Sequence, residues 1–245
     1  MPEEIGLTLK YLENLEKTSY GSLEIFSGNW IGLESKGIEV NIITAWSGWG
    51  KVNAAYETTR LIAQANRQKL DLDLILFTGV AGAVDPGLKQ WDVVVATSFV
   101  QHDMDARPIY KKYVIPGLNI SKIETDKHLK NWALKSLKKL SKKSFDPFKK
   151  IYSGLIATGD KFIDNKKEME FLVKNFNELK AVEMEGAAVA QVSNLESVPL
   201  LTIRVISDNA DNNAASSFEK FLLEYQYKSW NLINSLLMNI MDINK

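Results

Sequence analysis

The sequence predicts an α/β fold in one domain, on three observations. The chain has 245 residues, which is enough to bury the core of a single α/β domain. Short apolar runs rich in β-branched residues alternate with longer segments whose apolar residues recur at helical spacing. In residues 181–211 a strand pattern, a helix pattern and a second strand pattern follow one another, which is typical of a sheet with a crossover helix.

The composition indicates a small-molecule ligand. The 30 basic and 30 acidic side chains cancel, so the chain has no net field that would gather nucleic acid or an anionic membrane. It has no cysteine and two histidines, which excludes disulfides and thiolate metal sites and argues against a zinc centre. No apolar segment reaches membrane-spanning length and no signal peptide precedes the first helix pattern, so we expect a cytoplasmic protein.

The first fifty residues predict a helix and then a β-meander. Apolar residues at helical spacing from Ile5 through Leu9 and Leu12 to Leu15 indicate the helix. Three β-like runs follow, and we expect turns between them; the runs are 23–27, 30–34 and 38–45, and the turns are Gly28-Asn29 and Lys36-Gly37. A glycine loop at 47–51 then opens a helix, and such a loop is either an anion cradle or a tight turn.

The middle of the chain predicts two buried strands and a long loop. The strand at 72–77 runs into 78–83, where small side chains let a ligand approach the backbone. A second strand at 92–96 precedes the polar segment 101–116, which we interpret as a lid, a binding loop or a subunit contact. The lysine-rich segment 122–150 carries an apolar helical stripe, which favours a solvated outer helix over a nucleic-acid surface.

The C-terminal part predicts a strand at 151–157, a helix at 166–176 and a long final helix. Phe162 stands in the loop after that strand, where it is either a stacking platform for a ligand or ordinary loop packing. The final helix is expected to begin at the capping box 216–219 and to continue to Ile240.

Two acids stand where strands end. Glu185 follows the strand pattern at 182–184, and Asp208 follows the apolar run 200–206. Because two strands joined by a helix are expected to lie parallel, both carboxylates should emerge at the same edge of one sheet, where α/β proteins bind ligands. Either acid could instead cap a helix or form a surface salt bridge. The sequence therefore predicts a site with paired carboxylates.

Five motifs, in this order and spacing, closely resemble those of 5′-methylthioadenosine/S-adenosylhomocysteine nucleosidases of the purine nucleoside phosphorylase superfamily. They are Met1-Pro2-Glu3-Glu4, Thr78-Gly79-Val80-Ala81-Gly82, Gly159-Asp160-Lys161-Phe162-Ile163, Glu183-Met184-Glu185 and Arg204-Val205-Ile206-Ser207-Asp208. The resemblance covers almost the whole chain. It implies a three-layer α/β/α fold with a central mixed sheet, usually dimeric, which hydrolyses the N-glycosidic bond of adenine nucleosides without a metal or organic cofactor.

The resemblance also implies the catalytic roles. Asp208 resembles the general acid that serves N7 of the adenine, with Ser207 orienting it, and its pKa must be raised for that task. Glu185 resembles the carboxylate that binds the ribose and stabilises positive charge developing on the ring. Glu4 resembles the residue that activates the attacking water, although Glu3 beside it is an alternative.

Further substrate contacts follow from the same resemblance. Phe162 would stack on adenine and the backbone of Ile163 would read its edge, while Arg204 would pair with a site carboxylate. Trp49 would stand at the 5′-substituent pocket together with residues 106–109 of a partner subunit. The remaining substrate-binding residues are the small pair Ala81 and Gly82, Met184 beneath the ribose, and Phe218 at the 5′ pocket.

Three departures from the family pattern bear on function, and one of them is Trp49 in the glycine loop, which would narrow the 5′-substituent pocket. The family has a strand ahead of the Met-Pro-Glu-Glu turn, and we expect this first strand to be lacking here. Val80 stands where many relatives carry a serine. The alternatives are a purine nucleoside phosphorylase, a futalosine-type nucleosidase and a non-catalytic nucleoside-binding protein. Because phosphate requires arginines or an anion nest, and the early turn carries acids instead, hydrolysis is favoured.

Overall fold

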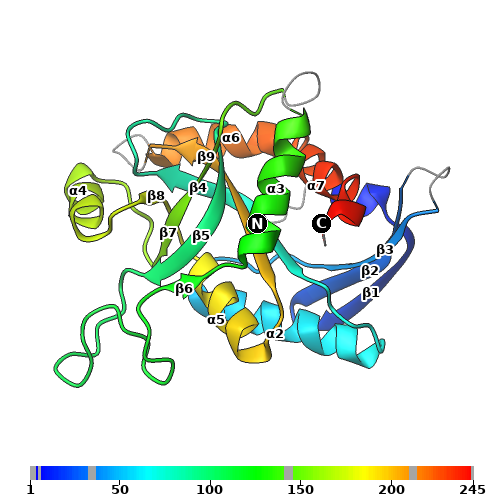
Figure 1. The fold of residues 1–245 in the computed structure, drawn as a ribbon, viewed down its shortest axis with the longest axis horizontal. Coiled ribbons are helices and arrows are strands. Elements are labelled where there is room, and N and C mark those ends of the chain that lie inside the picture. Colours follow the sequence, from blue (N-terminus) through cyan, green and yellow to red (C-terminus); the bar gives the residue numbers. More distant parts are fainter. Residues whose placement is uncertain (1–3, 5–6, 33–36, 141–145, 210–213, 244–245) are drawn as a thin grey trace.

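A mixed β-sheet with helices on both sides forms the body of the protein, and a three-stranded antiparallel sheet stands beside it (Figure 1). The computed structural model describes residues 4, 7–32, 37–140, 146–209 and 214–243, and at Leu140 and from Ala214 to residue 217 only the backbone. The α/β fold class predicted from the sequence is confirmed. Of the helices in these ranges, none has the length and apolar character needed to cross a membrane.

The strands and helices are as follows. The strands are β1 (Glu13–Tyr20), β2 (Leu23–Ile31), β3 (Glu39–Thr44), β4 (Ile75–Ala83), β5 (Val93–Gln101), β6 (Ile123–Glu124), β7 (Ile151–Thr158), β8 (Leu179–Glu183) and β9 (Leu200–Asp208). The α-helices are α2 (Lys51–Arg67), α3 (Lys127–Leu140), α4 (Lys166–Asn175), α5 (Gly186–Glu196), α6 (Ala214–Tyr225) and α7 (Ser229–Leu237), and two 3-10 helices are η1 (Thr8–Tyr11) and η3 (Ile240–Asp242).

The main sheet has the order β6-β5-β7-β8-β4-β9, and a further pairing of β5 with β9 closes it on itself. The pairs β4–β9, β5–β7 and β7–β8 are parallel, whereas β4–β8, β5–β6 and β5–β9 are antiparallel. Parallel strands need crossover connections, and the helices that make them cover the sheet. Figure 1 shows α2 and α5 on one side of the sheet and α6 and α7 on the other.

Strand β9 is buried on both faces, which explains its uninterrupted apolar run. Leu201, Ile203 and Val205 belong to the core cluster that contains side chains of α3, α6 and α7. Ile206 points to the other face and packs in the cluster that contains side chains of α2 and α5. Because successive side chains of a strand face opposite sides, β9, which ends at Asp208, is packed between two cores.

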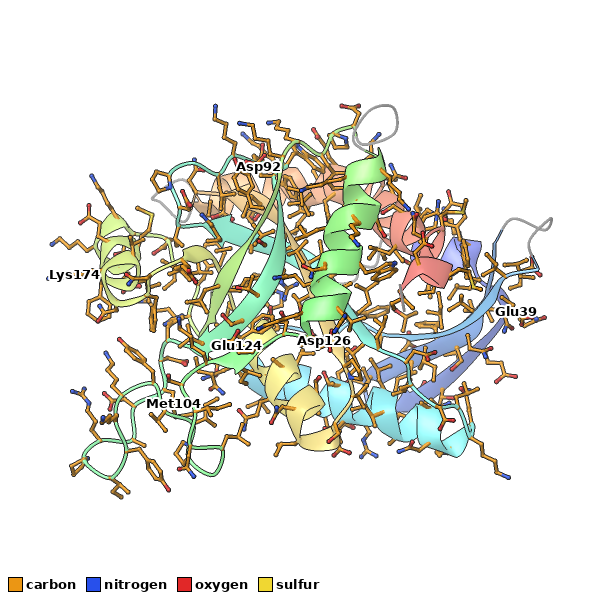
Figure 2. All side chains as sticks on the ribbon, in the orientation of Figure 1. Glu39, Asp92, Met104, Glu124, Asp126 and Lys174 are labelled. Atoms are coloured by element: carbon orange, nitrogen blue, oxygen red, sulfur yellow. The ribbon has the colours of Figure 1, made fainter. Side chains whose placement is uncertain are left out.

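Buried and capping acids fix the ends of other elements. Asp92 is 2% exposed and accepts backbone N–H bonds from Lys89 at 2.8 Å and from Lys150 at 3.0 Å. Asp126 accepts the N–H of Leu129 at 2.9 Å and so caps α3. Figure 2 shows Asp92 and Met104 at opposite ends of β5. An acid at a strand end is therefore not always a site residue in this protein.

Two sequence predictions for the N-terminal part are wrong. Residues 13–20 form β1 and not the end of a helix, because they pair with β2 across the hairpin at Gly21; Ile5, the start of the predicted helix, lies outside the described residues. Gly28 and Asn29 are not a turn, because β2 continues through them. A side chain at Gly28 would bring its Cβ to 2.8 Å from the carbonyl oxygen of Glu13, so this glycine permits close strand approach.

The predicted final helix is two helices. α6 ends at Tyr225 and α7 begins at Ser229, and the connection lets α7 turn towards the N-terminal part of the chain. There the ring of Trp230 stacks on Tyr11, with centroids 4.6 Å apart and planes 2° apart. The side chains of residues 214–217 are not described, so the predicted capping box lies outside the described side chains.

A cavity of about 610 Å³ lies between the two sheets, with β3 on one wall and the first half of β4 on the other. Within the described ranges the first strand is β1, and the two sheets share no pairing. Leu76 and Phe77 of β4 are accordingly only half-buried. Glu4, Glu185 and Arg204 also line this cavity, so it reaches the back of the site described next.

Candidate active site

A second and smaller pocket, of about 70 Å³, opens to solvent where β4, β8 and β9 end. Gly82 of β4 is paired with Val182 of β8 and with Asp208 of β9, so the three strand ends meet at one glycine. The sequence predicted that β8 and β9 are parallel, and this prediction is wrong. β4 lies between them and runs parallel to β9 but antiparallel to β8. The two acids nevertheless face the same pocket.

The pocket is lined by all but one of the site residues predicted from the sequence. These are Glu4, Trp49, Ala81, Gly82, Phe162, Ile163, Met184, Glu185, Ser207, Asp208 and Phe218. The exception is Arg204, which is 1% exposed and lies behind the lining. The pocket also contains residues that the sequence analysis did not select as site residues, namely Gly48, Val80, Lys161, Val182 and Glu183.

Asp208 is 5% exposed and is held by its neighbour Ser207. Oγ of Ser207 donates to Oδ2 of Asp208 at 2.7 Å, and the carbonyl of Ser207 accepts a hydrogen bond from Nε2 of Gln90 at 2.8 Å. Both residues belong to β9, which is buried along its whole length. The carboxylate of Asp208 therefore has a fixed orientation at the pocket wall.

Arg204 and Glu183 form a buried ion pair beneath the pocket. Nη2 of Arg204 donates to Oε2 of Glu183 at 2.5 Å, and the guanidinium carbon lies 4.1 Å from the ring centroid of Phe77. Glu183 also accepts hydrogen bonds from Oγ1 of Thr158 and, at 2.7 Å, from the N–H of Gly186. The sequence signal for Glu183 was its place two residues before Glu185, which puts both acids around the same strand end.

Glu183, and not Glu185, caps helix α5. The N–H of Gly186 donates to Glu183, whereas the side chain of Glu185 makes no capping hydrogen bond. Glu185 instead accepts the backbone N–H of Gly50 at 2.8 Å, across 135 residues of sequence. The helix-cap interpretation of Glu185 is therefore wrong.

Burial raises the pKa of Glu185 to about 7, and the negative charge of Glu183 acts in the same direction. Arg204, whose Nη2 lies 3.9 Å from Oε2 of Glu185, and the N–H of Gly50 lower it. The carboxyl of Glu185 therefore titrates near neutral pH.

Glu4 reaches the pocket beside the small-residue segment of β4. Its Oε1 accepts the N–H of Val80 at 3.1 Å. A Cβ at Gly79 would lie 2.4 Å from Oε1 of Glu4 and 2.1 Å from Nη1 of Arg204. Gly79 is therefore required by the close approach of these two side chains.

Three aromatic rings form one wall of the pocket. The ring of Phe218 meets Trp49 edge-on at 5.8 Å between centroids, and Phe162 at 5.9 Å. This T-shaped packing leaves ring surface available to a ligand. The wall therefore combines a glycine loop, the loop after β7 and helix α6.

Comparison with known proteins decides the family. The family model described as the phosphorylase superfamily matches residues 1–237. A 5′-methylthioadenosine/S-adenosylhomocysteine nucleosidase of Anoxybacillus flavithermus is 32% identical over 246 residues, covering 100% of this chain and 97% of that protein. The chain belongs to this nucleosidase family, within the phosphorylase superfamily.

Two further relatives of the nucleosidase family show its range. An aminodeoxyfutalosine nucleosidase of Helicobacter pylori is 40% identical over 205 residues, covering 82% of this chain and 83% of that protein. The crystal structure of the Neisseria meningitidis methylthioadenosine/S-adenosylhomocysteine nucleosidase with methylthio-immucillin-A superposes with a TM-score of 0.84 at 30% identity, covering 97% of this chain and 95% of that one. Membership of the family predicted from the five motifs is therefore confirmed.

Proposed function

We propose that this nucleosidase-family chain hydrolyses the N-glycosidic bond of 5′-methylthioadenosine, S-adenosylhomocysteine or both, and releases adenine. The observation that carries the proposal is the meeting of Asp208, Glu185 and Glu4 around one pocket that also has an aromatic wall. The names of the relatives support the same reaction. Cleavage of methylthioadenosine would make the reaction a step of methionine salvage.

Asp208 is assigned to the leaving group. Cleavage makes the sugar oxocarbenium-like, so adenine leaves more easily when a proton reaches its N7. The hydrogen bond from Ser207 to Oδ2 orients the carboxyl of Asp208 at the pocket wall. The carboxyl of Asp208 is 5% exposed and lines the pocket, where it can reach a bound base.

Glu185 and Glu4 are assigned to the sugar and the water. Glu185 accepts hydrogen bonds from ribose hydroxyls, and its charge stabilises the positive charge that develops on the ring. Glu4 orients and activates the water that attacks the anomeric carbon. The backbone bond from Val80 fixes the Glu4 carboxylate at the edge of the pocket. Met184 would form the surface beneath the ribose.

The remaining residues that line the pocket are assigned to contacts with the adenine base and the 5′ substituent. Phe162 stacks on adenine, and the backbone of Ile163 reads the edge of the base. Ala81 and Gly82 have small side chains, so the nucleoside can lie close to the backbone of β4. Trp49 and Phe218, in contact with each other, bound the 5′ substituent.

Hydrolysis is favoured over phosphorolysis by the charges of the pocket. Among the described lining residues the cation is Lys161, and it is bonded to Glu168. Arg204 is turned to Glu183 behind the lining. A phosphate ion would therefore face carboxylates without a guanidinium to bind it.

A second substrate class has a specific observation in its favour. The Helicobacter pylori relative that is 40% identical to this chain is an aminodeoxyfutalosine nucleosidase. The proposed acid, ribose and base contacts are independent of the 5′ substituent. Aminodeoxyfutalosine is therefore the second candidate substrate, and the choice depends on the pocket around Trp49.

We also propose that the protein is a homodimer. Trp49, Val52 and Tyr56 recur at helical spacing and expose 45%, 79% and 45% of their surface, and Ile109 exposes 83%. Large apolar side chains exposed to this extent are typical of a subunit interface. Sedimentation equilibrium of the wild type and of Val52→Glu tests this, because a charge at this position should shift the mass from dimer to monomer.

The cytoplasmic location predicted from the sequence stays a prediction.

A product assay tests the reaction. The protein is incubated with methylthioadenosine, S-adenosylhomocysteine, aminodeoxyfutalosine and adenosine, each with and without phosphate. We expect free adenine and an unphosphorylated sugar, at a rate independent of phosphate. A sugar 1-phosphate would identify a phosphorylase, and the absence of free base with every substrate would favour a non-catalytic nucleoside-binding protein.

A further inference from the structure

Three charged residues beside the pocket are not used by the proposed mechanism, and they join the start of one helix to two loops. They are Lys51, Asp103 and Asp160, which we call the clasp. Nζ of Lys51 donates to Oδ1 of Asp103 at 2.7 Å and lies 3.9 Å from Oδ2 of Asp160. The N–H of Asp160 donates to Oδ2 of Asp103 at 2.9 Å. The clasp thus connects the start of α2 with the loops that follow β5 and β7.

The clasp supplies a cap that α2 cannot supply itself. Its N-cap residue, Gly50, has φ +88°, a conformation that favours glycine and leaves no side chain for capping. The N–H of Lys51 donates instead to Oδ1 of Asp160 at 2.7 Å. A carboxylate there also faces the positive end of the helix dipole. Asp160 therefore holds the first turn of α2 in place from another part of the chain.

The same turn holds a carboxylate of the site. The N–H of Gly50 donates to Oε1 of Glu185, and the next N–H along the chain is the one bonded to Asp160. Phe162 stands two residues after Asp160. A displacement of Asp160 would therefore move both the support of Glu185 and the aromatic wall.

We propose that Asp160 and Lys51 are positioning residues that keep the Gly50 N–H on Glu185 and thereby set the orientation and the charge of this carboxylate. The inference rests on the proposed role of Glu185 at the ribose. The side chains of Lys51 and Asp160 are 18% and 48% exposed, and ion pairs that reach solvent add little to stability. The clasp therefore acts mainly on the geometry of the site.

The charge of Glu185 depends on its neighbours. Burial and the charges of Glu183 and Glu4 raise its pKa, whereas Arg204 and the N–H of Gly50 lower it. Loss of the Gly50 N–H raises the pKa of Glu185 further, so less of the carboxylate is ionised at neutral pH. The acidic limb of the pH–rate profile should then move to higher pH.

The test compares Asp160→Ala with Asp160→Asn in the full chain, using methylthioadenosine. Asp160→Ala removes the acceptor of the Lys51 N–H. We expect it to lower kcat/KM about tenfold, which corresponds to about 1.4 kcal/mol, and to move the acidic limb to higher pH. Asp160→Asn keeps an oxygen that can accept this N–H, so it should restore most of the rate. Adding Lys51→Met to Asp160→Ala should cost little more, because both act through one clasp.

The matched control is Glu24→Ala, which breaks the ion pair of Glu24 with Lys17 in the meander and should change neither rate nor profile. The proposal is overturned if Asp160→Ala has the pH–rate profile of the wild type. It is also overturned if the rate of Asp160→Ala falls only in proportion to the fraction of the protein that is folded. If the wild type releases no adenine, the proposed function fails separately. In that case the dissociation constant of methylthioadenosine is measured by calorimetry for the wild type and both variants. Weaker binding by Asp160→Ala, with normal binding by Asp160→Asn, would support the role of the clasp. Equal dissociation constants would overturn it.

Discussion

Arg204 and Glu183 are joined at 2.5 Å, and their side chains are 2% and 3% exposed. Both ends of the pair have further support, since Glu183 accepts the N–H of Gly186 and the guanidinium lies on the ring of Phe77. The pair ties β8 to β9 across β4 and lies directly beneath Glu185. It therefore forms a fixed floor for the carboxylates of the pocket.

Arg204→Met should destabilise the fold strongly. Removing one partner of a buried ion pair leaves the other charge without compensation, which typically costs about 3–5 kcal/mol. Urea unfolding followed by circular dichroism measures the change. Lys166→Met, which breaks a solvent-exposed pair with Glu170, is the control and should leave the midpoint unchanged. Equal midpoints for the two variants would contradict the structural role of Arg204.

Asp208→Asn should abolish adenine release and keep nucleoside binding. An amide cannot donate an acidic proton to the base, but it has nearly the same shape and can still accept from Ser207. The release of adenine and the calorimetric dissociation constant are measured on the same protein. Asp85→Asn, at a half-buried pair with Lys180 away from the pocket, is the control. A near-normal rate for Asp208→Asn would remove Asp208 from the mechanism.

Phe162→Ala should weaken adenine binding by about 1–3 kcal/mol, the magnitude of base stacking on an aromatic side chain. Phe162→Tyr keeps the ring face and should bind nearly normally. Calorimetric titration with adenine measures the dissociation constants. Phe171→Ala, at a ring that is 48% exposed on α4, is the matched control. If all three variants bind equally, Phe162 is only a packing residue.

The stability of the fold should fall as pH rises from about 4.5 to about 7, in part because of Glu57. This carboxyl on α2 is 5% exposed, and burial raises its pKa from 4.5 to about 7. Within that window the native state keeps a proton that the unfolded chain has lost, so deprotonation favours unfolding.

Glu57→Gln should remove this contribution, which is at most about 3 kcal/mol between pH 4.5 and pH 8. Urea unfolding at the two pH values measures it. Glu196→Gln, at the exposed end of α5, should keep the pH dependence of the wild type. An unchanged dependence in Glu57→Gln would show that Glu57 does not titrate as its burial implies.

The meaning of an acid at a strand end could not be assigned from the sequence. Asp92 precedes one apolar run and Asp208 follows another, yet Asp92 holds backbone N–H groups and Asp208 faces the pocket. Likewise Glu183 and Glu185 are two residues apart, and only the structure shows which of them caps α5. The capping geometry depends on where β8 meets the helix, which local patterns do not contain.

Apolar periodicity and the spacing of short motifs are local properties of the chain, so they were enough to predict the α/β class, most element positions and the family. It was wrong where a long-range contact overrides a local pattern, as at Gly28, where a neighbouring strand and not a turn requires glycine. The three-dimensional structure was needed to show that β4 separates β8 from β9, and that Asp160 caps α2 across 109 residues of sequence. Those contacts join residues distant in the chain, and their geometry is set by the packing of the whole sheet.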